Sequence, residues 1–498
     1  MLFDYSRPPQ QQRSPKVIIE VMEDNRPTLR STLTLALNHA LDHLSPSENR
    51  SVSATSTLAA LRQKLDIPLN RSGIDANTVL DELVSGVEGG ITDSAGGRFF
   101  GWVIGGSLPA ALAADWLTSA WDQNAGLYAC APAASVVEET AGRWLKEIFH
   151  LPASASFAFV TGAQMAHVTA LAAARHALLA RHGWDVEQNG LSGSPAIRIL
   201  TSTEKHGTLV RAVRLLGLGE KHITALKADA QGRLLEDSLK QALEAEPSVP
   251  TIVVLQAGDV NIGAFDDFAT LIPLAKKYNA WVHVDGAFGL WAAASPRLKH
   301  LLAGVEKADS WITDGHKWLN VPFDCGYAFV ADRAAHRASF AYHAAYLTHE
   351  TEARDQLDWN PEHSRRARGF ATYAAIRHLG TSGIADLVER TCAHAHALVT
   401  RIGSLPHSQM LWEPQINQGL VRFLHPGKNV TEQDHDAFTD HIMAEILKSG
   451  EAFFTGTTWR GHRAMRVSVS NWQTSSADVE RVCQCVSTVL EKASASVR

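Results

Sequence analysis

The chain has 498 residues, of which 45% are hydrophobic and 20% charged, a composition typical of a soluble globular protein with a large buried core. Its 46 basic and 52 acidic residues are interspersed and give a formal net charge of −6, so we expect no surface for nucleic acid or for an anionic membrane. No apolar run approaches the roughly 20 residues that span a bilayer.

The N-terminus and the cysteines indicate the compartment. Residues 1–16 lack the apolar core of a signal peptide. The five cysteines make no CxxC pair and no zinc-binding spacing, and an odd number fits a reducing environment. They are Cys130, Cys325, Cys392, Cys483 and Cys485. We therefore expect a cytoplasmic protein whose cysteines are packed thiols.

The first segment, residues 1–90, is predicted to be an arm followed by helices. About 25 residues rich in Pro, Gln and Arg have too little apolar surface to fold. Apolar residues then recur at helical spacing in 31-STLTLALNHALDHL-44, and 75-DANTVLDELVSGV-87 begins with a capping aspartate, Asp75. Such short amphipathic helices need another surface to cover.

Residues 91–335 alternate between short apolar strands and helical stretches. The predicted strands are 157–160, 197–200, 251–255, 281–284, 310–313 and 326–330. Nearly continuous apolar strands separated by helices predict an α/β fold with a mostly parallel central sheet, covered on both faces. A ligand of such a sheet binds at the carboxyl ends of the strands.

The pattern changes after residue 335. Residues 336–370 are polar and charged and are predicted to form a mobile loop region, with a solvated face over 352–368. Residues 371–498 predict a smaller C-terminal α+β domain. Its strands are expected in 419-GLVRFLHP-426 and 463-RAMRVSVSNW-472, with a helix in 431–450.

Two polar residues at predicted strand ends suggest a cofactor. Asp285 ends the strand in 281-WVHVDGAFGLW-291, and Lys317 follows the strand in 310-SWITDGHKWLN-320. Pyridoxal phosphate needs this pair, because an amine binds its aldehyde and a carboxylate keeps its ring nitrogen protonated. Ala287 is small enough to lie flat under the ring. The plainer alternatives are a surface lysine and a helix-capping aspartate.

Two further motifs fit the same cofactor. In 158-AFVTGAQMAHVTALAAAR-175, a strand leads through Gly162 into a helix, whose first backbone N–H groups could bind phosphate. In 200-LTSTEKHGTLVRA-212, His206 follows a strand and could stack on the ring. Each signal alone is weak, because strand-glycine-helix turns and single histidines are common in α/β proteins.

The order of these motifs resembles the group II pyridoxal-phosphate-dependent amino-acid decarboxylases, the family of aromatic-L-amino-acid, histidine and glutamate decarboxylases. "VDGAFG" and "GHKWLN" are the specific elements. Segments 98–117, 131–145 and 364–380 are similar to that family too, so the resemblance is nearly full length. It implies the aspartate-aminotransferase-like type I fold and a homodimer with shared active sites.

The resemblance also implies a role for each matching residue. Lys317 would be the Schiff-base lysine, Asp285 the partner of the ring nitrogen and Ala287 a ring contact. His206 would be the ring-stacking histidine that also faces the substrate. The phosphate would be held by Gly162, Ala163 and Gln164, with His316 beside it. Phe100 and Trp102 would be either core aromatics or walls of the substrate pocket.

The chain departs from this family in three places. Gln164 and Met165 stand where relatives have a hydroxyl and a Glu. Asp314 replaces an Asn or Ser near the phosphate, and because two anions repel each other we expect its side chain to point elsewhere. The loop tyrosine that protonates the substrate carbanion is missing between Tyr346 and Tyr373. Gln356 aligns near its position, and His343, His349 or His363 could substitute for it.

The predicted reaction is decarboxylation of an L-amino acid to an amine, with the substrate side chain undefined. Other fates of the carbanion remain open: aldol-type cleavage, transamination or oxidation to an aldehyde. Metal-dependent catalysis, prompted by 23 histidines and the His394/His396 pair, is disfavoured because those two diverge on a helix. A non-catalytic regulatory protein is a third class. Arg365 and Arg366 are expected to bind the loop region to a partner subunit.

Overall fold

The computed structural model describes residues 28–45, 50–342 and 353–496. The chain divides into two compact units, one comprising Met1–Arg50 and Ala54–Ile91, the other Ser51–Ser53 and Thr92–Arg498. No helix in the described ranges is long and apolar enough to cross a membrane. The predicted N-terminal arm lies outside the described residues, and the predicted boundaries at residues 90, 335 and 370 stay predictions.

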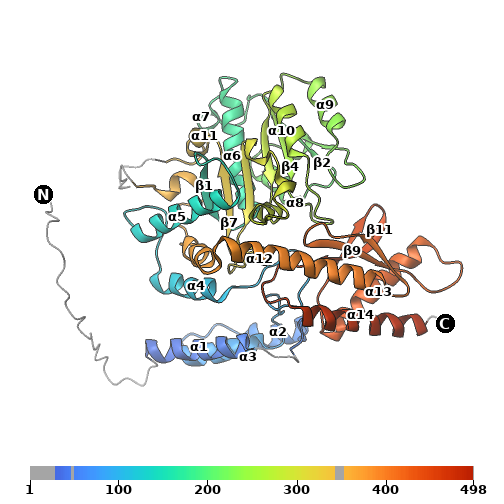
Figure 1. The fold of residues 1–498 in the computed structure, drawn as a ribbon. Coiled ribbons are helices and arrows are strands. Elements are labelled where there is room, and N and C mark those ends of the chain that lie inside the picture. The colour runs from blue at the N-terminus through green and yellow to red at the C-terminus, as the bar shows by residue number, and fades with distance from the viewer. Residues whose placement is uncertain (1–27, 46–49, 343–352, 497–498) are drawn as a thin grey trace. The chain divides into compact units, whose positions relative to one another are not determined.

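The first unit contains α1 (Leu29–Leu44), α2 (Leu58–Leu65) and α3 (Ala76–Val87), drawn in blue in Figure 1. Asp75 caps α3 as predicted, because its side chain accepts from the backbone N–H groups of Asn77 and Thr78. Apolar side chains on α1 stay exposed, among them Leu33 (58%) and Leu41 (52%). The helices therefore leave an apolar face uncovered.

The second unit contains a seven-stranded sheet in the order β1-β7-β6-β5-β4-β2-β3. Its strands are β1 (Ser156–Val160), β2 (Arg198–Ser202), β3 (Ile223–Leu226), β4 (Thr251–Gln256), β5 (Trp281–Asp285), β6 (Ser310–Asp314) and β7 (Gly326–Val330). All neighbouring pairs are parallel except those that involve β7. The prediction of a mostly parallel sheet is confirmed. The edge strand β3 was not predicted, because Thr224 and Ala225 are exposed and interrupt its apolar run.

Helices cover both faces of this sheet. The helices of this part of the chain are α4 (Pro109–Trp121), α5 (Pro132–Ile148), α6 (Ala163–Ala180), α7 (Val186–Asn189), α8 (Gly207–Leu215), α9 (Glu236–Ala245), α10 (Phe268–Lys277) and α11 (Arg333–Ala338). Short 3-10 helices lie between these elements: η1 (Glu220–His222), η2 (Gly289–Ala294), η3 (Lys299–Leu302) and η4 (Val305–Lys307).

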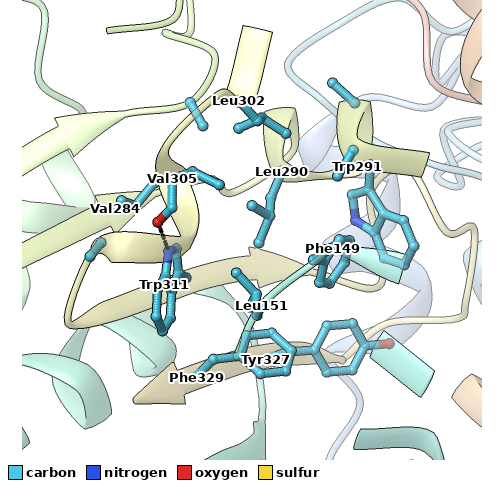
Figure 2. Packing of buried hydrophobic residues seen from close by; sticks show 14 of the residues in the cluster. Phe149, Leu151, Val284, Leu290, Trp291, Leu302, Val305, Trp311, Tyr327 and Phe329 are labelled. Carbon is cyan, nitrogen blue, oxygen red and sulfur yellow. Dashed lines mark hydrogen bonds between the residues drawn. The ribbon is translucent and has the colours of Figure 1, made fainter. Parts of the chain in front are cut away.

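Alternate residues of a single strand enter different cores, which is why the strands read as continuous apolar runs. In β4, Val253 and Leu255 pack into one cluster, whereas Ile252 and Val254 pack into another with residues of α6 and α8. Figure 2 shows part of the first cluster, where the Trp311 indole donates to the backbone oxygen of Val305 at 2.8 Å. The large aromatic side chains thus keep their polar atoms paired inside the core.

The C-terminal part forms the predicted smaller α+β structure. Its antiparallel sheet has the order β10-β11-β9-β8, with β8 (Ser408–Trp412), β9 (Gln418–Phe423), β10 (Thr455–Trp459) and β11 (His462–Ser468). The helices α12 (Gly369–Gly403), α13 (Glu432–Ser449) and α14 (Ser476–Ser496) complete it. Gly380 interrupts α12 with a left-handed φ of 61°, a conformation that glycine adopts without strain.

The prediction of a solvated face over 352–368 is wrong for most of the described residues 353–368, of which His363 and Ser364 are exposed. Around η5 (Gln356–Trp359), each residue is at most 4% exposed. The expectation that Arg365 and Arg366 bind a partner subunit stays a prediction, and both side chains have partners within this chain. Arg365 donates to both carboxylate oxygens of Glu138 at 2.7 Å, and Arg366 pairs with Asp115 at 2.7 Å, all in the same chain. Arg365 and Glu138 are buried as a pair, which satisfies both charges, whereas Arg366 and Asp115 are partly exposed.

Candidate active site

The carboxyl ends of β5 and β6 lie side by side and bring three polar residues to one edge of the sheet. The two strands are parallel neighbours with Asp285 opposite Ile312, and β6 ends at Asp314. Lys317 follows β6 after Gly315 and His316, and its Nζ lies 3.1 Å from Asp314 Oδ2. A carboxylate and an amine therefore face the same region, as the sequence predicts.

Asp285 is a buried carboxylate whose partners keep it ionised. It is 8% exposed, its Oδ1 accepts from the backbone N–H of Ala287 at 3.2 Å, and its Oδ2 lies 3.3 Å from His167 Nε2. Burial by itself raises the pKa of a carboxyl group. Here the contacts with His167 and the nearby His206 and Lys317 outweigh burial, so the pKa of Asp285 is lowered. This carboxylate can face a cationic ring nitrogen.

The environment of Lys317 is close-packed and partly apolar. Its Nζ lies 6.0 Å from the ring centre of Phe288. The segment before α4 passes directly over the lysine turn, because Gly105 N donates to His316 O at 3.3 Å. A Cβ on Gly105 would lie 1.9 Å from the backbone oxygen of Lys317, so only glycine fits there. This packing fixes the backbone that carries the amine.

The glycine turn at the start of α6 lies against the lysine turn. A Cβ on Gly162 would come within 2.9 Å of His316 Cε1, and His316 Nδ1 accepts from Cys325 N at 3.1 Å. Next in the turn, Gln164 has a buried Nε2 without a partner among the described residues. An unpaired buried donor at a helix N-terminus suits an anion such as a phosphate group.

The prediction that Asp314 points away from this turn is wrong. Its Oδ1 accepts from Ala163 N at 2.6 Å, and Lys317 Nζ and His316 Nε2 lie 3.1 and 3.5 Å from its carboxylate oxygens. Repulsion by a phosphate was the argument for another orientation. In this structure, two basic side chains and the N-terminus of α6 attract the carboxylate instead.

His206 lies at the N-terminus of α8, where its Nδ1 accepts from Thr208 N at 3.3 Å. The ring is accessible to solvent, although protein atoms surround most of it. This surrounding protein lowers the pKa of His206; Asp285 opposes the shift, and Lys317 and Arg466 add to it. Both predicted catalytic residues therefore act electrostatically on His206, although they are far from it in sequence.

The two aromatic candidates differ in their environment. Phe100 is fully buried in the core of the small domain and stacks on Phe454 with ring centres 5.3 Å apart. Trp102 is 53% exposed, and its ring lies 5.4 Å from that of Phe453. Phe100 is thus a core aromatic, and Trp102 alone of the two presents a ring to solvent.

Two residues of the site were not predicted, His167 and Arg466. His167 lies inside α6 and looks in sequence like an ordinary helix residue. Arg466 lies in β11, 6% exposed, and donates to Val260 O at 3.0 Å and to Thr455 Oγ1 at 3.3 Å. Burial lowers its pKa to about 10, so Arg466 stays cationic at neutral pH. The available signal was a single arginine between the apolar residues Met465 and Val467.

The candidates for the missing proton donor remain untested. His343 and His349 lie outside the described residues. His363 is exposed, and Gln356 is 1% exposed with both amide atoms unpaired among the described residues. Among the described residues, no hydrogen bond or ion pair joins either of these two to Lys317. The proton donor therefore stays undefined.

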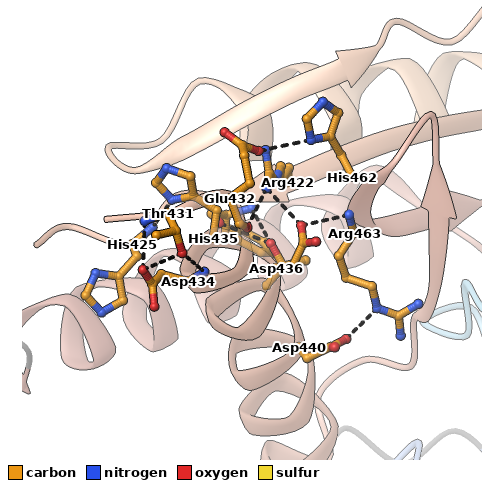
Figure 3. A network of polar contacts seen from close by, with 12 residues as sticks. Arg422, His425, Thr431, Glu432, Asp434, His435, Asp436, Asp440, His462 and Arg463 are labelled. Atoms are coloured by element: carbon orange, nitrogen blue, oxygen red, sulfur yellow. Dashed lines mark hydrogen bonds and ion pairs between the residues drawn. The ribbon is translucent and has the colours of Figure 1, made fainter. Parts of the chain in front are cut away.

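The histidine-rich surface of the small domain forms hydrogen bonds rather than a metal-ligand cluster. Figure 3 shows Arg422 between Glu432 and Asp436, at 2.7 and 2.8 Å, with His462 Nδ1 3.1 Å from the same glutamate. His396 pairs with Glu413 at 3.0 Å. Within the described ranges, no group of three or more His, Cys, Asp or Glu side chains could hold a metal ion.

The residues at the strand ends fit pyridoxal phosphate. The amine of Lys317 and the ionised Asp285 match its aldehyde and its ring nitrogen, and the unpaired Gln164 donor matches its phosphate. Asp314 opposes the phosphate charge.

The chain matches the family model described as "Pyridoxal-dependent decarboxylase conserved domain" over residues 60–425. It is 25% identical to an aromatic-L-amino-acid decarboxylase of Bacillus atrophaeus over 93% of this chain and 95% of the relative. It is 29% identical to an L-2,4-diaminobutyrate decarboxylase of Rhizobium meliloti (strain 1021), over 76% and 74% of the two chains.

The fold is similar to a crystal structure of Oryza sativa TDC with PLP and tryptamine. The TM-score is 0.87 at 24% identity, and the match covers 93% of this chain and 97% of that one. The predicted type I fold is thereby confirmed.

Proposed function

The chain belongs to the pyridoxal-dependent decarboxylase family, whose cofactor is pyridoxal 5'-phosphate, and we propose that it converts an L-amino acid into CO2 and the corresponding amine. The observation that carries the proposal is the placement of Lys317 and the ionised Asp285 at neighbouring strand ends. These side chains supply the amine and the anion that this cofactor requires.

Each side chain at the edge of the sheet has a part in the proposal. Lys317 would hold the cofactor through its aldehyde, and the same amine would be displaced by the amino group of the substrate. Asp285 keeps the ring nitrogen protonated, and the Gly162 turn with Gln164 holds the phosphate. When bound, the cofactor accepts the electron pair that CO2 leaves on the α-carbon. His206, accessible to solvent beside both residues, contacts the ring and the substrate.

We infer that Arg466 binds a carboxylate group of the substrate. It is a buried cation close enough to influence His206, and its Nε has no partner among the described residues. Thr455 Oγ1 links it to Trp102, whose backbone N–H donates to the same oxygen at 3.4 Å. The exposed Trp102 ring then forms a wall for the substrate side chain. An Arg466→Gln variant should raise KM at least about tenfold, because a charge-assisted hydrogen bond is lost.

A product assay with the purified chain tests the proposed reaction. The protein is loaded with pyridoxal phosphate and incubated with the twenty amino acids and with 3,4-dihydroxyphenylalanine, and CO2 and amine are measured. Borohydride reduction followed by peptide mass spectrometry should label Lys317. The Lys317→Ala variant should lose the label and the activity, whereas Lys307→Ala, at an exposed lysine near the start of β6, should keep both.

Two outcomes would overturn the proposal. Absence of the cofactor label on wild-type protein would leave a non-catalytic member of the fold. Turnover without CO2 release would indicate aldol-type cleavage or transamination in place of decarboxylation.

A second candidate is oxidation to an aldehyde, and it rests on the missing loop tyrosine. No tyrosine lies between Tyr346 and Tyr373, and Gln356 near that place has a buried side chain. A carbanion that is not protonated quickly can react with oxygen. Aldehyde, ammonia and hydrogen peroxide alongside CO2 would favour this candidate, and a stoichiometric yield of amine would exclude it.

We also propose that the enzyme is a homodimer. The apolar face of α1, with Leu33, Leu37 and Leu41 at least 40% exposed, requires a cover, and a second copy of the same unit would supply one. Light scattering should give about twice the mass of 54.1 kDa. Leu37→Glu should shift the protein toward the monomer, and an unchanged monomeric mass in wild-type protein would refute the dimer.

A cytoplasmic location is the remaining part of the proposal. All five cysteines are free thiols, and such thiols persist in a reducing compartment. Cell fractionation with an antibody to the chain should find it with the soluble cytoplasmic enzymes.

A further inference from the structure

A line of buried polar groups runs from Asp285 into the core beneath the sheet edge. We call four of them the relay: Trp281, Ser310, His283 and His167. Each is at most 1% exposed. Trp281 Nε1 lies 2.9 Å from Ser310 Oγ, Ser310 Oγ lies 2.8 Å from His283 Nδ1, and His283 Nε2 lies 2.9 Å from His167 Nδ1. The last link is the 3.3 Å contact of His167 Nε2 with Asp285 Oδ2.

The indole at the far end of the relay gives it a direction. An indole N–H can only donate, so Ser310 Oγ must accept from Trp281. In the described part of the chain, the Ser310 hydroxyl has no acceptor other than His283 Nδ1. If Ser310 donates there, the proton of His283 is on Nε2, where it can be donated to His167.

The same reasoning continues to the carboxylate. His167 accepts from His283 through Nδ1, so its own proton is on Nε2, which faces Asp285. The 3.3 Å contact is an ion-pair distance and does not meet hydrogen-bond geometry, and this nitrogen has no hydrogen-bond partner among the described residues. With both imidazoles neutral and the carboxylate charged, every other donor in the relay is used once, and this N–H faces Asp285.

The opposite direction leaves two groups unpaired. If His283 donated to Ser310, the serine hydroxyl would receive two hydrogen bonds and have no acceptor for its own proton. A neutral His167 would then turn a lone pair toward the carboxylate of Asp285, which is repulsive. Burial independently favours an uncharged His283, because it lowers the pKa of that histidine to about 3.

We propose that the relay is a one-way hydrogen-bond chain that fixes the His167 tautomer and thereby presents an N–H to Asp285. Its members are positioning residues, since none of them is assigned a contact with substrate or cofactor. In the proposed state Asp285 keeps its charged form, with one oxygen 3.3 Å from the relay and the other accepting from Ala287 N. The inference rests on the proposed function, because it gives Asp285 its task of stabilising the protonated ring nitrogen.

The first test needs no cofactor. Protein labelled with 15N-histidine is examined by NMR at neutral pH, and the His167 and His283 signals are assigned by substitution of each residue. We expect both imidazoles to be neutral with the proton on Nε2. A proton on Nδ1 of either ring would overturn the proposal. So would the signal of an imidazolium, with both nitrogens protonated, from His167.

A matched pair of serine variants tests the direction. Ser310→Ala removes the donor to His283 Nδ1 and should shift the His283 and His167 nitrogen signals. Ser156→Ala is the control, because Ser156 also contacts a buried histidine, His336, at 2.7 Å, yet lies outside the relay. It should leave both signals unchanged. Unchanged signals in Ser310→Ala would contradict a direction set by the indole.

Cofactor affinity tests the last link of the relay. His167→Met has similar bulk and no donor, and its dissociation constant for pyridoxal phosphate, measured by absorbance titration, should rise about tenfold. His167→Gln restores an N–H of similar reach and should recover most of the affinity. Equal affinity in wild type and His167→Met, or no recovery in His167→Gln, would refute the link. Failure of wild-type protein to bind pyridoxal phosphate would instead refute the proposed function and leave the tautomer result standing.

Discussion

Asp314 and Lys317 form an ion pair at the end of β6, with 3.1 Å between Oδ2 and Nζ. The second carboxylate oxygen binds the N–H of Ala163 at the start of α6. Asp314 thus pairs with the amine that the sequence assigns to the cofactor aldehyde. It also binds the N-terminus of α6, which the sequence assigns to the cofactor phosphate. The cofactor has to compete with this aspartate.

Removal of that charge should tighten cofactor binding. We expect Asp314→Asn to lower the dissociation constant for pyridoxal phosphate by roughly threefold to tenfold, because repulsion of the phosphate disappears while an amide still fits the site. Absorbance titration of cofactor-free protein measures it. Asp309→Asn is the control, since Asp309 precedes the same strand and pairs with Lys276. Weaker binding by Asp314→Asn would mean that Asp314 helps to hold the cofactor.

Asp285→Asn should separate cofactor binding from turnover. The amide keeps the shape of the carboxylate, so Lys317 should still bind the cofactor aldehyde. The ring nitrogen loses its anion, and kcat should fall at least about a hundredfold. Steady-state kinetics and the absorbance of the bound cofactor measure the two effects. Near-normal turnover would make Asp285 a cap for the Gly286 turn, and Asp266→Asn controls for loss of a buried carboxylate elsewhere.

Buried histidines should make the protein less stable in mild acid. Burial lowers the pKa of His336 to about 3, whereas an unfolded chain has a histidine pKa near 6.5. Between these values the unfolded chain binds a proton that the folded chain does not. The free energy of unfolding therefore falls as the pH drops below about 6.5, by at most about 1.4 kcal/mol per pH unit for this group.

Thermal unfolding at several pH values between 5 and 7 checks this dependence. The decline of Tm toward acid should be shallower in His336→Gln than in wild type, because the variant has one fewer histidine to protonate on unfolding. His300→Gln, at an exposed position, should keep the wild-type slope. An identical slope in His336→Gln would show that this histidine is already charged in the folded protein.

Removal of one partner from the buried ion pair of Glu138 and Arg365 should strongly lower the free energy of unfolding. Both side chains are fully buried, and the guanidinium also donates to Phe159 O at 2.7 Å. Glu138→Ala leaves an uncompensated charge and should lower the free energy of unfolding by about 3–5 kcal/mol. Denaturant titration measures the loss.

Two comparisons sharpen that result. The double variant Glu138→Leu/Arg365→Met removes both charges and should be more stable than Glu138→Ala. Glu480→Ala breaks the exposed pair with Arg401 and should cost less than about 1 kcal/mol. A double variant no better than Glu138→Ala would indicate that packing, and not the unpaired charge, dominates.

The sequence by itself determined the strands of the large domain and the residues at their ends. Six strands were predicted from continuous apolar runs such as 251–255, because residues on both faces of a covered sheet are apolar. Asp285 and Lys317 could be found because each directly follows such a run. The edge strand β3 could not, since its exposed residues carry no such pattern.

Only the tertiary structure decided which charges meet. His167 and His283 lie 116 residues apart in sequence and 2.9 Å apart in space, and Arg466 comes to the site from the small domain. Asp314 turned toward the phosphate turn, and Arg365 became buried, because each found a partner contributed by another element. Apolar periodicity involves residues close together in sequence, so it can be recognised without the structure. The pairing of polar side chains depends on distances that exist only after the elements have packed.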